Sequence, residues 1–139
     1  MTTSAHKSRS GCLWLLLVPL LPLVIYLGWI SILPTATVHY SKNGKEDLKY
    51  IWNVQHRIYK GDMPPGGAFS DHGVLFPDEN FFMMVEWWGE NVRHHCVRIT
   101  PKWPNTHIYL DANGDIDSSE GSGTDIDRLK PCPGGSFDP

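Results

Sequence analysis

The residues best suited to metal chemistry lie close together in the second half of the chain. Met83 and Met84 carry soft thioether sulfurs, and His94 and His95 bring imidazoles to the same stretch. Thioether and imidazole ligands together suit copper, and imidazole also suits zinc. Adjacent residues on a strand point to opposite faces, so His94 and His95 cannot both reach one ion there. These residues support a second-ranked hypothesis, a periplasmic protein that handles copper or zinc.

Cysteine usage competes with such a metal site. Cys96 and Cys132 are the two cysteines that follow residue 33. An even number of cysteines in an oxidising compartment predicts a disulfide. Closing a loop of this span would stabilise the fold by about 4 kcal/mol in the chain-entropy model. The expected bond between Cys96 and Cys132 removes Cys96 from any set of metal ligands.

A row of oxygen-bearing residues resembles the start of a calcium loop of the EF-hand or dockerin kind. These residues are Asp111, Asn113, Asp115 and Asp117. Such a loop needs glycine at its sixth position and an acid at its twelfth, where this chain has Ile116 and Ser122. The first prediction is therefore an Asn-Gly hairpin turn with solvated aspartates. A weak calcium site is the alternative.

Glu86 is the one charged residue in an apolar run over residues 81–88. A tight turn after that run would place Glu86 opposite His94 or His95, and a carboxylate beside an imidazole can act as a general acid–base pair. A third hypothesis is thus a small hydrolase that uses Glu86 and a histidine. No nucleophile elbow, Walker loop or dinucleotide fingerprint accompanies the pair. We therefore predict neither an enzyme nor a cofactor.

Tryptophan is the remaining signal of function. Trp87, Trp88 and Trp103 lie in or beside predicted strands of one domain. Neighbouring Trp87 and Trp88 must point to opposite faces of a strand, so at least one of them can reach the surface. Exposed tryptophan is a residue type that anchors protein partners. We predict these three as candidate partner-binding residues, together with a Pro-Gly loop over residues 63–67.

All of these residues follow an uncharged segment, residues 12–33, which reads CLWLLLVPLLPLVIYLGWISIL. As a helix it would be about 33 Å long, enough to cross the hydrocarbon core of a bilayer. It lacks the polar stripe of a helix at the surface of a soluble domain. A cleaved signal peptide has a shorter apolar region and a small-residue cleavage site. We therefore predict a transmembrane helix.

Flanking charges and cysteines predict the direction of insertion. His6, Lys7 and Arg9 precede the apolar segment, whereas Lys42 is the one lysine or arginine in the ten positions after it. Basic residues favour the cytoplasmic side. Together with the expected disulfide, this bias predicts a bacterial inner-membrane protein. Its residues 1–11 would be a cytoplasmic tail, and its C-terminal domain would be periplasmic.

The chain after residue 33 has the pattern of one β domain. The run 48–59 fits a helix or a strand, and its β-branched and aromatic content favours a strand. We predict a mainly β fold, in which an N-terminal transmembrane helix precedes a small antiparallel β-sandwich or barrel-like domain over residues 34–117. The other runs rich in β-branched and aromatic residues, separated by Gly, Asn and Pro, cover residues 35–40, 81–88, 92–100 and 106–110.

Acidic residues concentrate at the end of the chain. Residues 34–110 have eight acidic and eight basic residues, whereas residues 111–139 have seven acidic residues and two basic ones. This distribution excludes a basic nucleic-acid-binding face as the main theme. Residues 118–139 are rich in Gly, Ser and Pro, and they are too polar to add to a core. We predict an irregular acidic tail there, tethered by Cys132.

The leading hypothesis combines the anchor with a small domain that binds another macromolecule. We predict a single-pass, membrane-anchored periplasmic protein-binding domain. An accessory subunit of an envelope complex and a toxin-immunity protein fit the residues equally. The acidic end would attract a basic partner electrostatically. The motifs identify no family.

Overall fold

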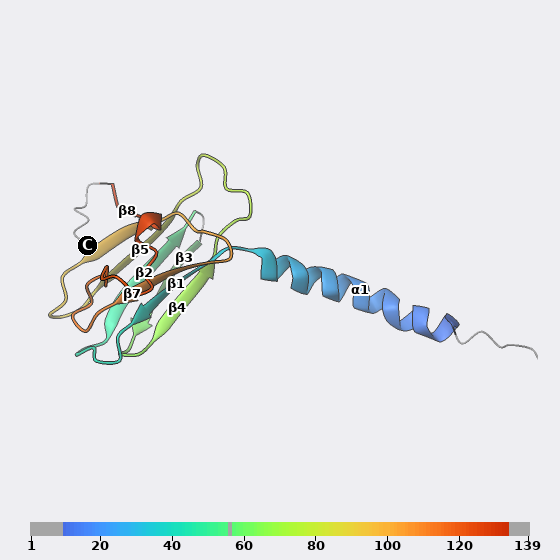
Figure 1. Cartoon of the computed structure of the whole chain (residues 1–139), viewed down its shortest axis with the longest axis horizontal. Helices are drawn as coiled ribbons and strands as arrows, with labels where there is room; N and C mark the ends of the chain where they lie inside the picture. Colours follow the sequence, from blue (N-terminus) through green and yellow to red (C-terminus); the bar gives the residue numbers. More distant parts are fainter. Residues whose placement is uncertain (1–9, 56, 134–139) are drawn as a thin grey trace, which may run out of the picture. The chain divides into compact units, whose positions relative to one another are not determined.

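In the computed structural model, residues 10–55 and 57–133 are described, and the chain divides after Ile32 into two compact units. The first unit contains the helix α1 (Ser10–Ile32), and the second is a β domain (Figure 1). In order along the described chain, the elements of the domain are β1 (Thr35–Tyr40), β2 (Leu48–Val54), β3 (Arg57–Met63), β4 (Ala68–His72), β5 (Met83–Trp88), β6 (His95–Ile99), β7 (Asn105–Leu110), the short 3₁₀ helix η1 (Ile126–Arg128) and β8 (Leu129–Pro131).

α1 begins two residues before the predicted apolar segment and ends one residue before that segment does. Its stretch Trp14–Ile32 has none of its 19 residues buried, and it is long and apolar enough to cross a membrane. Pro19 and Pro22 lie inside the helix, as transmembrane helices tolerate. The prediction of an apolar helix here is confirmed. Its length and composition fit a membrane anchor or a signal sequence.

Two separate sheets form the domain, and neither closes into a barrel in the described residues. Sheet A has the strand order β4-β1-β7, and sheet B has the order β3-β2-β5-β6-β8. Sheet B is antiparallel throughout, as predicted, whereas β1 and β7 in sheet A run parallel. The prediction of a mainly β fold is confirmed. The prediction that all strands of the domain pair antiparallel is wrong. A parallel pair needs a long crossover, and the chain that builds most of sheet B provides it.

Inward-facing side chains of both sheets share one core. Val38 of β1, Val85 of β5 and Ile108 of β7 are fully buried, because alternate residues of a strand point to the same face. Phe69 of β4 stacks on Tyr50 of β2 with ring centroids 3.9 Å apart. A contact of this kind contributes about 0.5–1.5 kcal/mol beyond the area it buries. It also links sheet A to sheet B.

The ambiguous run 48–59 forms a hairpin rather than one strand. β2 and β3 pair along their whole length, from Leu48 opposite Met63 to Val54 opposite Arg57. The chain therefore reverses just after Val54. Gln55 has a φ of 46°, the left-handed conformation that two-residue hairpin turns need. The strand prediction is therefore correct in type. The reversal is missed because no Asn-Gly or Asp-Gly pair marks it.

Residues 118–133, the described part of the predicted irregular tail, contain the short elements η1 and β8 and pack on the domain. Leu129 is 7% exposed and belongs to the core, and β8 pairs with β6. Asp125 Oδ2 accepts a hydrogen bond from the His107 N–H at 2.8 Å, and the Asp125 N–H donates to the His107 carbonyl at 2.9 Å. Thr124 Oγ1 accepts from the Tyr109 N–H in the same way. Polar side chains thus cover the free edge of β7, which is why a polar composition folds here.

Candidate functional site

Sheet B has a face turned away from the core, and the centre of that face combines apolar side chains with one carboxylate–imidazole pair. Side chains alternate between the two faces along β2 and β5. Trp52 and Trp87 point inward, and their neighbours on the same strands, such as Ile51 and Trp88, point outward. The outward apolar residues are half-buried, so part of each side chain meets water. We name this outward centre the Trp88 face, and it consists of Ile51, Met84, Glu86, Trp88 and His94.

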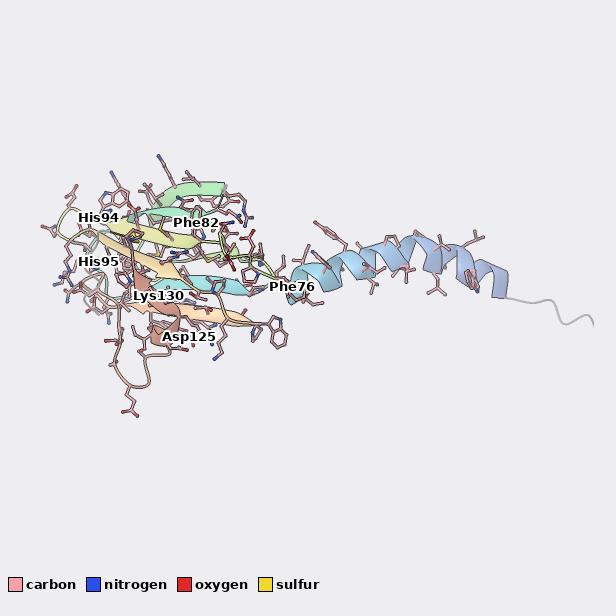
Figure 2. The ribbon with its side chains drawn as sticks, turned by 90° about the horizontal axis from the view of Figure 1, so that it is seen from above. Phe76, Phe82, His94, His95, Asp125 and Lys130 are labelled. Atoms are coloured by element: carbon pink, nitrogen blue, oxygen red, sulfur yellow. A yellow bond between two sulfur atoms is a disulfide. The ribbon has the colours of Figure 1, made fainter. Side chains whose placement is uncertain are left out.

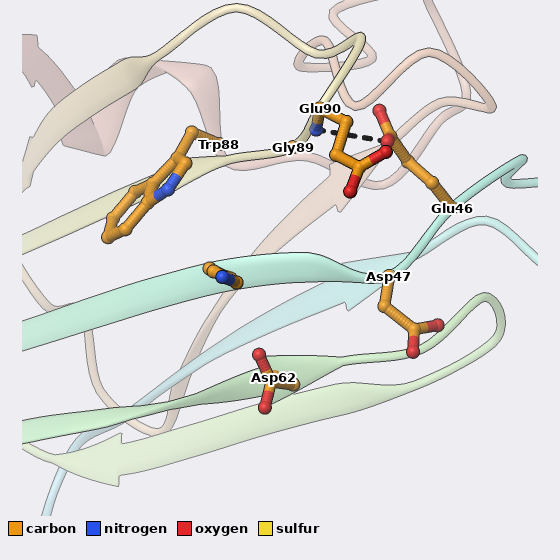
Figure 3. Close-up of a pocket in the computed structure, with 7 residues that line it drawn as sticks. Glu46, Asp47, Asp62, Trp88, Gly89 and Glu90 are labelled. Carbon is orange, nitrogen blue, oxygen red and sulfur yellow. Dashed lines mark hydrogen bonds between the residues drawn. The ribbon is translucent and has the colours of Figure 1, made fainter.

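Three open depressions meet at Trp88, which lines all of them. The largest, of about 560 Å³, extends from Trp88 to Glu46 and is drawn in Figure 3. A second, of about 360 Å³, lies over β2 and β3. The third, of about 450 Å³, contains Glu86 and His94. A tryptophan among adjoining pockets is typical of protein contact surfaces, where aromatic residues dominate the binding energy.

The depression in Figure 3 is acidic. The Glu46 carboxylate is already engaged, because its oxygens accept hydrogen bonds from the backbone N–H groups of Glu90 (3.0 Å) and Asn91 (2.9 Å). The other carboxylates of the rim are exposed to water. Such a rim favours a basic group on a binding partner. The charged residues that line it are Glu46, Asp47, Asp62, Glu90 and the single basic residue Lys49.

Glu86 and His94 form the contact that the acid–base hypothesis requires, with Oε2 and Nε2 3.2 Å apart. The predicted register is wrong, because Glu86 pairs with Cys96 and Trp87 pairs with His95. A longer turn shifts the register, and His94 reaches Glu86 diagonally. The two side chains are 36% and 57% exposed, so water screens them. The pair has the environment of a surface ion pair rather than of a desolvated catalytic dyad.

The four predicted metal ligands divide between the two faces of sheet B. Met83 is fully buried, and His95 lies on the same inner face, stacked on Trp87 with ring centroids 5.1 Å apart. Met84 and His94 lie on the outer face. The structure therefore does not bring the four together. Within residues 10–55 and 57–133, no three His, Cys, Asp or Glu side chains are arranged to hold a metal ion.

His95 joins sheet B to the turn after β7. Its Nε2 lies 3.1 Å from Asp115 Oδ1 without the alignment of a hydrogen bond, and Arg93 Nη2 lies 3.4 Å from the same oxygen. Burial lowers the pKa of His95, and the Asp115 carboxylate offsets part of that effect. In the same region Trp87 donates its Nε1–H to the Gly114 carbonyl at 2.7 Å. These contacts stabilise the inner side of β5 and β6.

The aspartates of the calcium-like sequence bond to their own turns. Asp111 Oδ1 accepts hydrogen bonds from the backbone N–H groups of Asn113 (2.8 Å) and Asp115 (3.0 Å). Asp117 Oδ1 accepts from the N–H and the hydroxyl of Ser119, which lowers the pKa of Asp117. Leu110 and Ile116, which flank the turn over residues 111–115, form an antiparallel β-bridge. The predicted Asn-Gly hairpin turn is confirmed.

The three predicted partner-binding tryptophans have different environments. Trp87 is completely buried, so its prediction as a contact residue is wrong. Trp88 is half-buried on the outer face of sheet B, and Trp103 is 62% exposed in the loop between β6 and β7. Met63 of the predicted Pro-Gly loop is also buried, because it ends β3. Trp88 and Trp103 are the two that a partner can reach.

A histidine pair that sequence reasoning missed lies on the outer face of sheet A. His39 Nε2 and His107 Nδ1 are 3.2 Å apart, and the His39 ring stacks on Tyr109 with centroids 4.5 Å apart. Burial lowers the pKa of His39, and the neighbouring His107 lowers it further. The alternating pattern of 35–40 indicates which face His39 occupies. It does not indicate that β7 is the neighbouring strand.

The predicted disulfide is present, with the Cα atoms of Cys96 and Cys132 5.7 Å apart. It ties the chain after β8 to the outer side of β6. No family model, no curated protein and no solved structure matches the chain. Function is therefore inferred from the surfaces of the domain and from α1.

Proposed function

We propose that this chain is a membrane-anchored domain that binds a protein partner through the Trp88 face. The observation that carries the proposal is the pair of apolar side chains, Met84 and Trp88, at two of the three outward positions of β5, with Glu86 at the third. A strand that is apolar at both inward and outward positions is normally covered on both sides. In the described residues the inward side chains of β5 are fully buried and the outward ones are not. A partner protein would supply the second cover.

The chemistry of the face defines the partner. An apolar side chain of the partner would pack between Trp88 and Ile51, and a basic side chain beside it would meet the carboxylates of Asp62 and Glu90. A buried aromatic anchor of this kind contributes about 2 kcal/mol or more to binding. The surrounding charges act mainly on the association rate and on the choice of partner.

The compartment belongs to the same proposal. α1 would hold the domain at the bacterial inner membrane, with the N-terminus in the cytoplasm and the domain in the periplasm. The basic residues Lys7 and Arg9 before α1 support this direction, and the disulfide suits an oxidising compartment. An accessory subunit of an envelope complex or an immunity protein that blocks a toxin would use this arrangement.

Site-specific photocrosslinking in native membranes tests the binding face. A photoreactive amino acid replaces Ile51 on the outer face of sheet B or, as a matched control, Ser70 on the outer face of sheet A. We expect an adduct of one discrete mass from position 51 and none from position 70. Adding Trp88→Ala should abolish the adduct while the melting temperature stays nearly unchanged. Equal adducts from both positions, or an adduct that survives Trp88→Ala, would overturn the proposal.

The anchor and its direction have a separate test. We expect the full chain to stay in the membrane after an alkaline carbonate wash. A phosphatase that is active only in an oxidising compartment should be active when it is fused after Pro139, and a fluorescent protein that folds only in the cytosol should stay dark there. Release by carbonate would show that α1 is not an anchor. The opposite reporter pattern would reverse the direction.

A further inference from the structure

Two large aromatic side chains are exposed at the end of the domain where the chain arrives from α1. Phe76, in the loop between β4 and β5, is 86% exposed, and Trp103, in the loop between β6 and β7, is 62% exposed. Two large exposed rings at one end of a domain make that end a candidate contact surface. The question is what those rings meet.

Backbone hydrogen bonds hold both loops against the first residues of the domain. The Gly73 N–H donates to the Pro34 carbonyl at 2.7 Å, and the Thr35 N–H donates to the Pro104 carbonyl at 3.1 Å. Trp103 directly precedes Pro104, and Phe76 follows Gly73 by three residues. Space around Gly73 is tight, since a Cβ there would lie 2.9 Å from the Pro101 ring. We name this end the Pro34 corner, made of Pro34, Gly73, Phe76, Trp103 and Pro104.

We propose that the Pro34 corner rests on the lipid bilayer, with the Phe76 and Trp103 rings at the level of the headgroups. The inference rests on the proposed function, because it requires α1 to span the membrane. Leu33 alone separates the end of α1 from Pro34, and each extended residue reaches about 3.5 Å. The corner therefore begins within two residues of the membrane surface. Tryptophan concentrates at that interface.

Charges near the rings limit the depth of the contact. Lys102 precedes Trp103 and is exposed, and a lysine at this level is attracted to anionic headgroups. Asp78 and Glu79 follow Phe76 in the same exposed loop, and carboxylates are costly in hydrocarbon. The corner therefore lies among the headgroups and does not enter the acyl region.

This contact would orient the Trp88 face. β1 leads away from the Pro34 corner and β2 returns toward it, and Trp88 pairs with Lys49 at the start of β2. Phe76 and His94, which lies beside Trp88, are at opposite ends of the domain in Figure 2. With the corner on the membrane, the Trp88 face runs away from the lipid, from Met84 at the near end of β5 to Trp88 at the far end. A partner approaching from the aqueous side would meet the Trp88 end of the face first.

Fluorescence of the full chain in vesicles tests the contact. A Cys12→Ser background keeps the disulfide and accepts one new cysteine, at Phe76→Cys, Trp103→Cys or, as the control at the far end, Asn43→Cys. Each is labelled with an environment-sensitive dye and reconstituted in phosphatidylcholine–phosphatidylglycerol vesicles that carry a headgroup-level nitroxide quencher. We expect the quencher to remove roughly half of the emission at positions 76 and 103 and almost none at 43, because interfacial rings lie at that depth.

Two outcomes separate this inference from the proposed function. If the chain in native membranes is released by carbonate, α1 is not an anchor and the proposed function fails with it. If the chain is retained but positions 76 and 103 are quenched no more than position 43, α1 is still an anchor. The proposed contact of the Pro34 corner with lipid is then overturned. An unchanged melting temperature of each labelled variant is the control that quenching reports on lipid and not on unfolding.

Discussion

The outer faces of the two sheets differ in how their side chains are satisfied. On sheet A the outward side chains bond to one another across strands, with Thr35 Oγ1 3.2 Å from His72 Nδ1 and His39 Nε2 3.2 Å from His107 Nδ1. On sheet B, Glu86 and His94 also pair at 3.2 Å, but Trp88 and Ile51 line open depressions that have carboxylates on their rims. A polar group already paired gains little from a partner, whereas exposed apolar area gains on burial. This difference supports the proposal that sheet B, rather than sheet A, binds a partner.

The sharpest test of this comparison uses adjacent residues on β5. Trp87→Ala removes a fully buried side chain and its bond to Gly114, so we expect it to lower the free energy of unfolding by about 3–5 kcal/mol. Trp88→Ala, on the outer face, should cost less than about 1 kcal/mol. Urea unfolding of the two variants measures the difference. Similar losses would mean that Trp88 is also part of the core.

The disulfide is a covalent link on the outer side of sheet B. Replacing Cys96 and Cys132 with serine opens a loop whose ends are 36 residues apart, and we expect a loss of about 3–4 kcal/mol by the chain-entropy model. Reduction of the wild-type chain should give a similar loss, measured as the shift of the urea midpoint. An unchanged midpoint would show that the bond does not form in solution.

The edge of sheet A gives a smaller effect. Asp125→Ala removes the carboxylate that accepts from the His107 N–H, and we expect a loss of about 1–2 kcal/mol. Asp127→Ala is the matched control, because its side chain is 66% exposed and pairs with Arg128 at the surface. Thermal unfolding should separate the two variants. If both leave the melting temperature unchanged, the segment after residue 117 does not cover the edge of β7.

The pH dependence of stability is the smallest expected effect. The pKa values of His39 and His95 lie below the ordinary 6.5 in the folded chain, so near that pH the unfolded chain binds more protons than the folded one. Stability should therefore be highest above about pH 6.5 and fall as the pH decreases toward the folded pKa values. His39→Gln should flatten part of this slope. A slope that rises toward acid pH would contradict both assignments.

Local pattern predicted element type better than it predicted pairing. The apolar run 81–88 is typical of a central strand, and sheet B has β5 in the middle of its order. β4 gave no comparable signal, because its residues are AFSDH and Phe69 is the one strong β former. The outward position of Ile51 was readable from alternation, since Trp52 and Val54 point inward. The alternation of side chains did not predict the turn at Gln55, because the chain reverses there without the usual glycine.

The candidate site shows the same division. Sequence reasoning named Trp88, Glu86 and His94, but it placed them in three separate hypotheses. A shift of one residue in strand register changes which side chains are neighbours, and the sequence did not specify that register. It missed His39 and His107, which the parallel pairing of β1 with β7 brings together. Residues far apart in the chain meet through strand order, and no local pattern carries that order.

By itself, the sequence determined the apolar helix, the β character of the domain and the pairing of its two cysteines. Each of these follows from composition or from counting, because the hydrophobic effect and the two-residue period of strands act on neighbouring residues. The tertiary structure decided which tryptophan is buried, and it decided that the polar residues 118–133 pack on the domain. Burial and edge protection depend on what the rest of the chain places beside a residue, and that is a property of the whole fold.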